Sequence, residues 1–312
     1  MRCIDTHCHY NLEPLYSGKP SHFRIKPGDP IVSGHWRQHL STALQHGVLG
    51  GVVVGADLEN SKRAIELHQL EPRLLASIGL HPDLVDSTAT EYLKQNPHAT
   101  TTALQAYLFS TVDSLAAELE TLAKSTSLVA IGETGCDYYY FGDDHSVNEV
   151  LRAAQARLFQ QQLQLAKRLN LPVIVHTRDK GDQAYFDALN QLKHAKLDQP
   201  FVLHCVSGPL DYIEQALAIG AHLGFDGNLT YKNAQSLEHI LQLTPVDRIL
   251  IETDAPYLPP VPYRGQICEP WMVVKVAERV CTLKDTTESQ LLDTTARFFG
   301  PSVSSLITDQ TS

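Results

Sequence analysis

Eight short apolar runs, rich in β-branched residues, alternate with longer amphipathic stretches along the chain. The apolar runs, which we expect to be strands, cover residues 3–4, 51–55, 74–80, 127–131, 172–176, 201–205, 221–225 and 248–252. The helical patterns cover residues 35–46, 61–70, 112–124, 150–169, 183–192, 210–219 and 233–241, and two more, 271–281 and 288–299, close the chain. Strand alternating with helix eight times predicts a parallel α/β fold.

Two parallel architectures fit this alternation, an open doubly wound sheet and a closed barrel. A dinucleotide-binding sheet would have Gly-x-Gly-x-x-Gly after its first strand, and the sequence has no such motif there. Unusual polar residues stand at or just beyond the C-terminal ends of six of the runs, where barrel active sites are built. Although two domains would be the simple expectation at this length, we predict one (β/α)8 TIM-barrel domain over residues 1–312, with its active site at this end.

Charge and hydrophobicity limit the partners that the chain can have. The formal net charge of −10 opposes broad attraction to a phosphate backbone, so bound cations would have to supply much of the attraction to a nucleic acid. No apolar run reaches the ~18 residues of a membrane span, and the first residues lack a signal-peptide core. Six cysteines without Cys-x-x-Cys spacing indicate reduced thiols. We expect a cytoplasmic protein with no membrane partner and no obligate protein partner.

The first candidate metal ligands follow the first and fourth predicted strands. His7 and His9 are separated by one residue, so in a strand both imidazoles point to the same side. Glu133 follows the apolar run 127–131 after a glycine and could bridge two cations. Taken alone, His-x-His is more often a polar strand end, and a lone glutamate is more often a helix cap.

Three later strands also end in ligand-type residues. His176 and His204 each terminate an otherwise apolar run, which needs a reason to carry an imidazole. The last run ends in Glu252 and Asp254, which share strand parity, and we choose Asp254 because it lies further toward the C-terminal mouth. Nitrogen and carboxylate ligands at five strand ends together indicate a metal site. This mixed set fits Zn, Mn, Co or Fe(II) better than Mg, although Mg stays open as the working ion.

An ordered series of motifs resembles the TatD family of metal-dependent deoxyribonucleases, which belongs to the amidohydrolase-like metal barrels. The resemblance spans nearly the whole chain. It rests on Asp5-x-His7-x-His9, Gly79-Leu80-His81-Pro82, Ile131-Gly132-Glu133-x-Gly135-x-Asp137, Gln155-x-x-x-Phe159-x-x-Gln162-Leu163, Leu171-Pro172-Val173-x-Val175-His176-x-Arg178, Leu203-His204-Cys205-x-Ser207-Gly208 and Glu252-Thr253-Asp254-Ala255-Pro256.

The resemblance implies two divalent metal ions, one held by His7, His9, Glu133 and Asp254, the other by Glu133, His176 and His204. It also implies substrate contacts from His81, Arg178, Arg264 and Glu269. Where the family usually has asparagine before Glu269, this chain has Cys268. Two segments, residues 10–30 and 82–109, look like insertions after strand ends that rim or cover the site. These departures bear on substrate preference rather than on metal binding.

Three functions follow in decreasing order of expectation. The first, which the family implies, is hydrolysis of DNA phosphodiester bonds by a metal-activated water, of the 3′-to-5′ exonuclease type and favouring single-stranded ends. Asp254 would accept the proton of that water, and Glu133 would be the shared ligand. The second is hydrolysis of a small phosphoester, lactone, ester or amide. The third is a catalytically silent metal-binding protein, which the presence of all six ligands disfavours.

Overall fold

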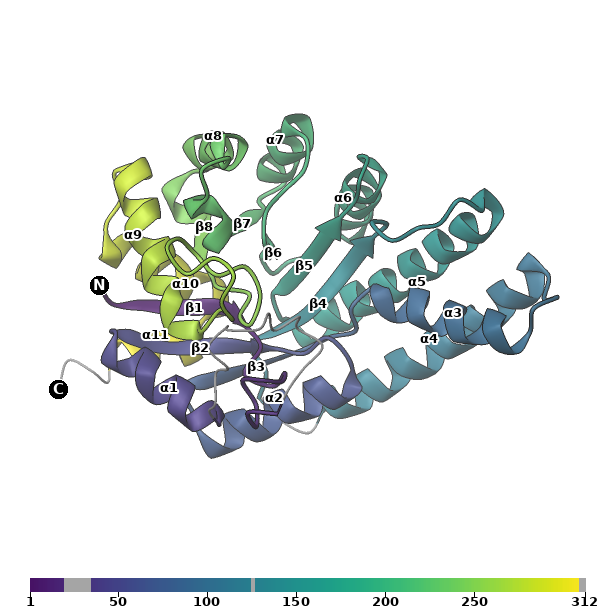
Figure 1. Cartoon of the computed structure of the whole chain (residues 1–312), viewed down its shortest axis with the longest axis horizontal. Helices are drawn as coiled ribbons and strands as arrows, with labels where there is room; N and C mark the ends of the chain where they lie inside the picture. Colours follow the sequence, from purple (N-terminus) through teal and green to yellow (C-terminus); the bar gives the residue numbers. More distant parts are fainter. Residues whose placement is uncertain (20–34, 125–126, 309–312) are drawn as a thin grey trace.

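Eight parallel strands form the centre of the molecule. The structure is a computed structural model, and it describes residues 1–19, 35–124 and 127–308. Within them the strands are β1 (Cys3–Cys8), β2 (Val48–Val54), β3 (Leu74–Ile78), β4 (Ala130–Asp137), β5 (Val173–Arg178), β6 (Phe201–Leu203), β7 (His222–Phe225) and β8 (Ile249–Ile251). They pair side by side in chain order, every pair parallel. Because sequential parallel strands need crossovers, a helix follows almost every strand (Figure 1).

The sheet curls until its first and last strands meet just beyond their C-terminal ends. The Asp254 N–H donates to the His7 carbonyl at 2.9 Å, and the His9 N–H donates to the Ala255 carbonyl at 2.8 Å. A parallel bridge also joins Cys8 and Ala255. The predicted (β/α)8 barrel is therefore confirmed, in nearly closed form, and its seam lies among the predicted metal ligands.

The helices surround this barrel. They are α1 (Trp36–Gln45), α2 (Leu58–Leu70), α3 (Asp83–Gln95), α4 (Thr101–Ala123), α5 (His145–Leu169), α6 (Gln183–Ala195), α7 (Leu210–Ala218), α8 (Gln235–Leu243), α9 (Val273–Lys284), α10 (Glu288–Phe299) and α11 (Pro301–Thr308), with short 3-10 helices η1 (Gly227–Thr230), η2 (Val246–Arg248) and η3 (Pro270–Met272). Among the described residues, none of these helices is long and apolar enough to cross a bilayer.

Side chains from seven strands, among them Ile4, Val52 and Leu250, form one buried cluster, which is possible only inside a barrel. Phe298 of α10 and Val303 of α11 join this cluster. These two helices therefore close the end of the barrel opposite the metal ligands, and a packed interior leaves the C-terminal mouth as the place for a site.

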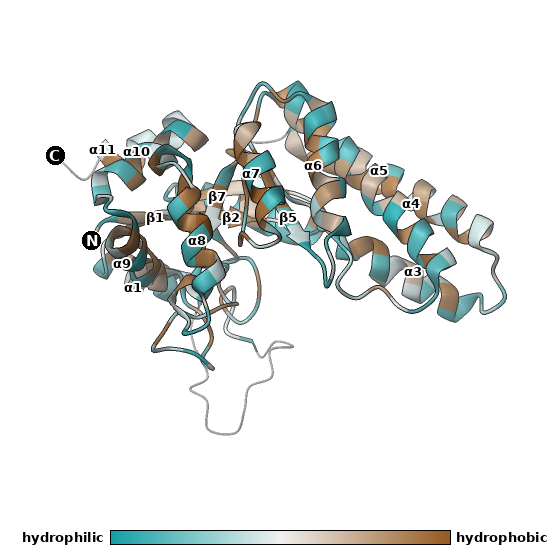
Figure 2. Ribbon diagram, turned by 90° about the horizontal axis from the view of Figure 1, so that it is seen from above, coloured by the Kyte–Doolittle hydropathy of each residue, from teal (hydrophilic) through white to brown (hydrophobic). Residues whose placement is uncertain are grey.

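The segment 82–109, predicted as a polar insertion, forms instead the helix α3 and the first part of α4. Thr100, the first of three consecutive threonines, is a helix N-cap whose hydroxyl accepts from the Ala103 N–H at 3.2 Å. Leu104, Leu108 and Val112 then make a buried stripe at four-residue spacing. Figures 1 and 2 show α3 and α4 extending with α5 to one side of the barrel. Of the other predicted insertion, residues 20–30 lie outside the described residues.

A buried histidine at the base of β7 makes a testable contribution to acid sensitivity. The His222 ring packs on Phe298 at 4.9 Å between centroids, and burial lowers its pKa from 6.5 to about 4. The unfolded chain therefore takes up this proton first as the pH falls, so the stabilisation is complete above about pH 6.5 and is lost on the way to pH 4. We expect His222 to account for about 3 kcal/mol of the loss in unfolding free energy between pH 7 and pH 4.

Urea unfolding of the wild type and of His222→Gln over this pH range measures that contribution. The variant cannot titrate at this position, so its unfolding free energy should fall less steeply with acid than that of the wild type. Parallel pH curves for the two proteins would show that His222 does not contribute.

Candidate metal centre

The Glu133 carboxylate is the centre around which the predicted ligands gather. Its Oε1 lies 3.0 Å from His176 Nδ1 and 3.2 Å from His204 Nε2. Its Oε2 lies 3.5 Å from His7 Nε2 and 3.8 Å from His9 Nε2. The two oxygens of one carboxylate thus face two different pairs of imidazoles, as a ligand shared between two cations would.

Asp254 completes the first of these two groups. Its Oδ1 lies 3.2 Å from His9 Nε2 and 3.6 Å from His7 Nε2. Its φ of 57° is sparsely populated for a residue other than glycine, and the hydrogen bond from its N–H to the His7 carbonyl holds it there. All six predicted ligands therefore meet at the barrel mouth, four of them buried and two, His176 and Asp254, partly buried.

The charges of the group fit a bound divalent cation. Nε2 atoms of His7 and His9 lie 3.3 Å apart, and His176 Nδ1 lies 3.2 Å from His204 Nε2, so each pair can share only one proton between its facing atoms. Burial lowers the pKa of His204, but the charge of Glu133 outweighs this and raises it well above its usual range. The buried carboxylates are therefore stabilised by nearby positive charge, which a divalent cation bound to neutral imidazoles would supply.

The Glu133 carboxyl is ionised in these surroundings. Burial alone would raise its pKa, but the charges of His81 and His204 and the hydrogen bond from His176 hold that pKa well below its usual range. The buried His7 Nδ1 has no hydrogen-bond partner within the part of the chain that the structure describes. Carboxylate oxygens and imidazole nitrogens are the ligands that Zn, Mn, Co and Fe(II) accept, so this donor set can hold such an ion.

Two features of the surrounding residues hold the neighbouring segments close together around the centre. A Cβ on Gly79, after β3, would lie 2.4 Å from the carbonyl carbon of Gly132. Only glycine at position 79 therefore lets these two backbone segments pass each other beside Glu133. On the other side of the barrel, buried Asp5 accepts from the Thr253 N–H at 3.0 Å and from its hydroxyl at 2.6 Å. Asp5 thereby ties β1 to the segment that carries Asp254.

A second layer of carboxylates, which we did not assign from the sequence, supports the histidines. Asp137 Oδ2 lies 3.4 Å from His176 Nε2 and accepts from Arg178 Nη2 at 2.7 Å. Glu252 Oε1 lies 3.4 Å from His204 Nδ1 and accepts from the Cys205 N–H at 2.6 Å. The available signal was spacing from a predicted ligand, because Asp137 lies four residues after Glu133 on β4 and Glu252 lies two residues before Asp254.

Because Glu252 faces the ring nitrogen of His204 that points away from Glu133, we expect it to hold the imidazole in position. Outer-shell carboxylates of this kind are worth about 10- to 100-fold in metal affinity. Glu252→Gln should therefore weaken binding of Mn²⁺ or Zn²⁺ by about this factor, measured by calorimetric titration of metal-free protein. Unchanged affinity in a variant with the wild-type circular dichroism spectrum would argue against a supporting role for Glu252.

Two of the four predicted substrate-binding residues lie with the ligands. His81 Nε2 is 3.3 Å from Glu133 Oε1, and Arg178 lines the same cavity. Burial lowers the pKa of His81, but Glu133 and Asp83 outweigh it and raise the pKa to about 10.

The other two predicted substrate contacts lie elsewhere and have protein partners. Arg264 lies over the Tyr231 ring at 4.2 Å, and Glu269 Oε2 lies 2.9 Å from His39 Nδ1. Neither is among the residues that line the cavity. Their contact with substrate stays a prediction.

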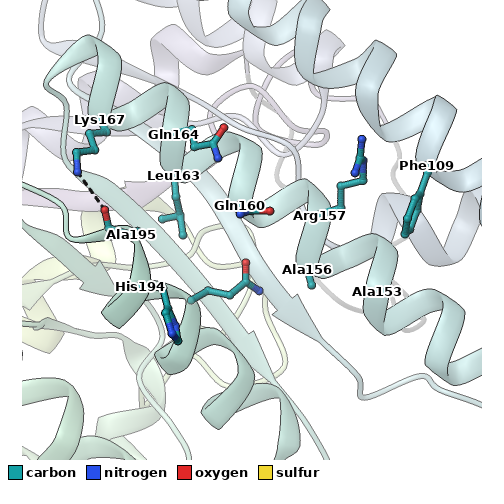
Figure 3. Close-up of a pocket in the computed structure, with 11 residues that line it drawn as sticks. Phe109, Ala153, Ala156, Arg157, Gln160, Leu163, Gln164, Lys167, His194 and Ala195 are labelled. Atoms are coloured by element: carbon teal, nitrogen blue, oxygen red, sulfur yellow. Dashed lines mark hydrogen bonds between the residues drawn. The ribbon is translucent and has the colours of Figure 1, made fainter.

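The cavity over the centre has a volume of about 650 Å³, within the usual range of roughly 300–1,000 Å³ for ligand sites. A hollow of about 690 Å³ lies elsewhere, on the outside of the barrel between α4, α5 and α6 (Figure 3). Lys167 and His194 are among its lining residues, and Lys167 donates to the Ala195 carbonyl at 3.2 Å. Among the described residues no carboxylate lines that hollow, and the groups of histidines and acids that could hold a cation lie at the barrel mouth.

Comparisons with known proteins agree with this arrangement. Residues 4–299 match the family described as TatD related DNase. The chain is 30% identical over 302 residues to YjjV of Escherichia coli K12, covering 96% of this chain and 98% of the relative, and 32% identical over 246 residues to YabD of Bacillus subtilis, covering 78% and 83%. Both relatives are described as uncharacterized metal-dependent hydrolases.

Solved structures give the same result. The crystal structure of YjjV, a TatD homologue, superimposes with a TM-score of 0.68 at 28% identity, covering 95% of this chain and 97% of that one. A TatD family hydrolase from Entamoeba histolytica shares the fold with a TM-score of 0.68 at 20% identity, covering 96% and 98%. The match over residues 4–299 and the relatives of similar length lead to one conclusion. The chain belongs to the TatD family of metal-dependent hydrolases.

Proposed function

We propose that this protein is a deoxyribonuclease that hydrolyses phosphodiester bonds and releases nucleotides from 3′ ends, using two divalent metal ions. The observation that carries the proposal is the position of Arg178 and of His81, whose pKa is raised, on the same cavity as five of the six candidate ligands, all but His7. A phosphodiester brings one negative charge, which paired cations recognise, whereas an ester, a lactone or an amide brings none.

Water activation is the task of the ligand group. A bound divalent ion would lower the pKa of water and withdraw charge from a phosphoryl oxygen. Asp254 is suited to accept the proton of the attacking water. Burial would raise its pKa, but His9, His7 and His204 hold that pKa below the usual value, so the carboxylate is ionised at neutral pH. His81 and Arg178 would contact the non-bridging oxygens of the phosphate.

A small phosphoester is the second candidate substrate, and the charge of the whole protein favours it. The net charge of −10 repels a long polyanion beyond the reach of the local cations. The same ligands and the same cations would serve a small phosphoester, so the two candidates differ in the length of substrate rather than in chemistry.

Release of labelled mononucleotides from 3′-labelled single-stranded and double-stranded DNA tests the proposal. Purified protein would be assayed with Mg²⁺, Mn²⁺, Co²⁺ or Zn²⁺, beside the His204→Ala variant. Metal-dependent release that disappears in the variant would support the nuclease. No release with any of the four metals, together with turnover of a small phosphoester, would overturn the nuclease in favour of the second candidate.

A further inference from the structure

Four consecutive aromatic residues follow β4, and they have two different environments. Tyr138 is buried, stacks on Phe141 at 4.7 Å between centroids, and donates its hydroxyl hydrogen to Asp187 at 3.0 Å. Tyr139 and Tyr140 are instead 38% and 70% exposed. Tyr138 and Phe141 anchor this segment by themselves, so packing does not account for the two exposed rings.

One of the two exposed rings lines the candidate metal cavity, and the other ring lies against the first. Tyr140 lines that cavity together with His176 and Arg178. The rings of Tyr139 and Tyr140 meet edge to face, 5.0 Å apart. The Arg178 guanidinium lies 4.9 Å from the centroid of the Tyr140 ring and 5.1 Å from that of Tyr139. Arg178 covers one face of the Tyr140 ring. Because Tyr140 is 70% exposed, the other face is open to a planar group.

One carboxylate fixes this aromatic pair relative to the metal ligands. Asp137 Oδ1 accepts from the Tyr139 N–H at 3.0 Å, while its Oδ2 accepts from Arg178 and lies 3.4 Å from His176 Nε2. The Gln155 side chain holds the Asp137 backbone on both sides, accepting from its N–H at 2.9 Å and donating to its carbonyl at 2.8 Å. These contacts hold the rings at a fixed position relative to His176.

The positive charge around the rings points to a planar group attached to phosphate. Lys180 Nζ lies 5.1 Å from the Tyr139 centroid and adds a second cation to Arg178. Aromatic rings bordered by cations are how proteins hold unpaired nucleobases, because every base offers a π-face and every nucleotide a phosphate. A base inside a duplex is already stacked and paired and cannot offer its face.

We propose that Tyr139 and Tyr140 form a stacking platform for an unpaired nucleobase that flanks the scissile phosphodiester bond, with Tyr140 making the direct contact. This inference rests on the proposed function, hydrolysis of DNA. The platform would distinguish a nucleic-acid strand from a phosphoester without a base. It would also favour single-stranded ends over a duplex.

An abasic substrate tests the platform. Metal-loaded protein would be given a single-stranded oligonucleotide and two copies of it that carry a tetrahydrofuran abasic residue on one or the other side of the terminal phosphodiester. For one of the two abasic copies, the wild-type kcat/KM should be lower than for the oligonucleotide with all its bases. The expected ratio is about 5- to 150-fold, the range for loss of one base-to-ring stack. In Tyr140→Ala this ratio should approach one, and Tyr140→Trp should restore it.

Tyr107→Ala is the matched control, because Tyr107 is 43% exposed on α4, stacks on Tyr92 and does not line the cavity. It should keep the wild-type ratio. If the wild type cleaves DNA but the ratio is the same in Tyr140→Ala, the platform is wrong and the nuclease stands. If the wild type cleaves no DNA at all, both proposals are overturned.

Discussion

Asp254→Asn should lower kcat by about 10²- to 10⁴-fold, the usual contribution of a general base, while leaving the fold intact. The substitution keeps the shape of the side chain, but an amide is too weak a base to accept a proton from water. The loss of charge also weakens the oxygen ligand that faces His7 and His9 at 3.6 and 3.2 Å. We therefore expect a large fall in kcat. The metal concentration needed for activity should rise by a smaller factor.

Steady-state assays at saturating metal separate these two effects. Asp211→Asn makes the same chemical change at an exposed position on α7 and should have wild-type kinetics. Turnover by Asp254→Asn within a few-fold of the wild type would show that another group accepts the proton.

Glu133→Gln should have the largest effect on metal binding. Each predicted histidine ligand has a ring nitrogen within 3.8 Å of a Glu133 oxygen. Loss of the carboxylate charge therefore affects both groups of ligands at once. We expect affinity for Mn²⁺ or Zn²⁺ to fall by more than about 100-fold, beyond the 10- to 100-fold of an outer-shell residue such as Glu252.

Thermal unfolding gives a second measure of the same loss. A metal ion at 100 times its Kd stabilises the folded protein by about 2.7 kcal/mol, so the wild-type Tm should rise on adding metal. The Tm of Glu133→Gln should not rise at that concentration, and that of Glu252→Gln should rise partly. A full rise in Glu133→Gln would place the metal elsewhere.

The meeting of six candidate ligands at the barrel mouth could be predicted because polar residues stand at the ends of otherwise short apolar runs. His176 and His204 follow runs of buried aliphatic residues, and no polar side chain would be tolerated there without partners. The barrel brings the strand ends together, so identifying the alternation was enough to place residues as distant as His7 and Asp254 in one group.

Other features depend on contacts that sequence spacing does not contain. β4 was predicted to end at residue 131, but it continues to Asp137 through a polar, glycine-rich stretch because β5 pairs with it, Gly135 opposite His176 and Asp137 opposite Arg178. The role of Glu252 could not be read from parity alone. It faces His204 from behind, where Gly224 makes room, since a Cβ there would lie 2.5 Å from Glu252 Oε2.

Titration of metal-free protein with Mn²⁺, followed by mononucleotide release from single-stranded DNA, tests the central claim most directly. The account predicts no release before the first addition, a rise that saturates near two equivalents for each chain, and no rise in His204→Ala. Full release by the metal-free protein in the presence of a chelator would contradict it.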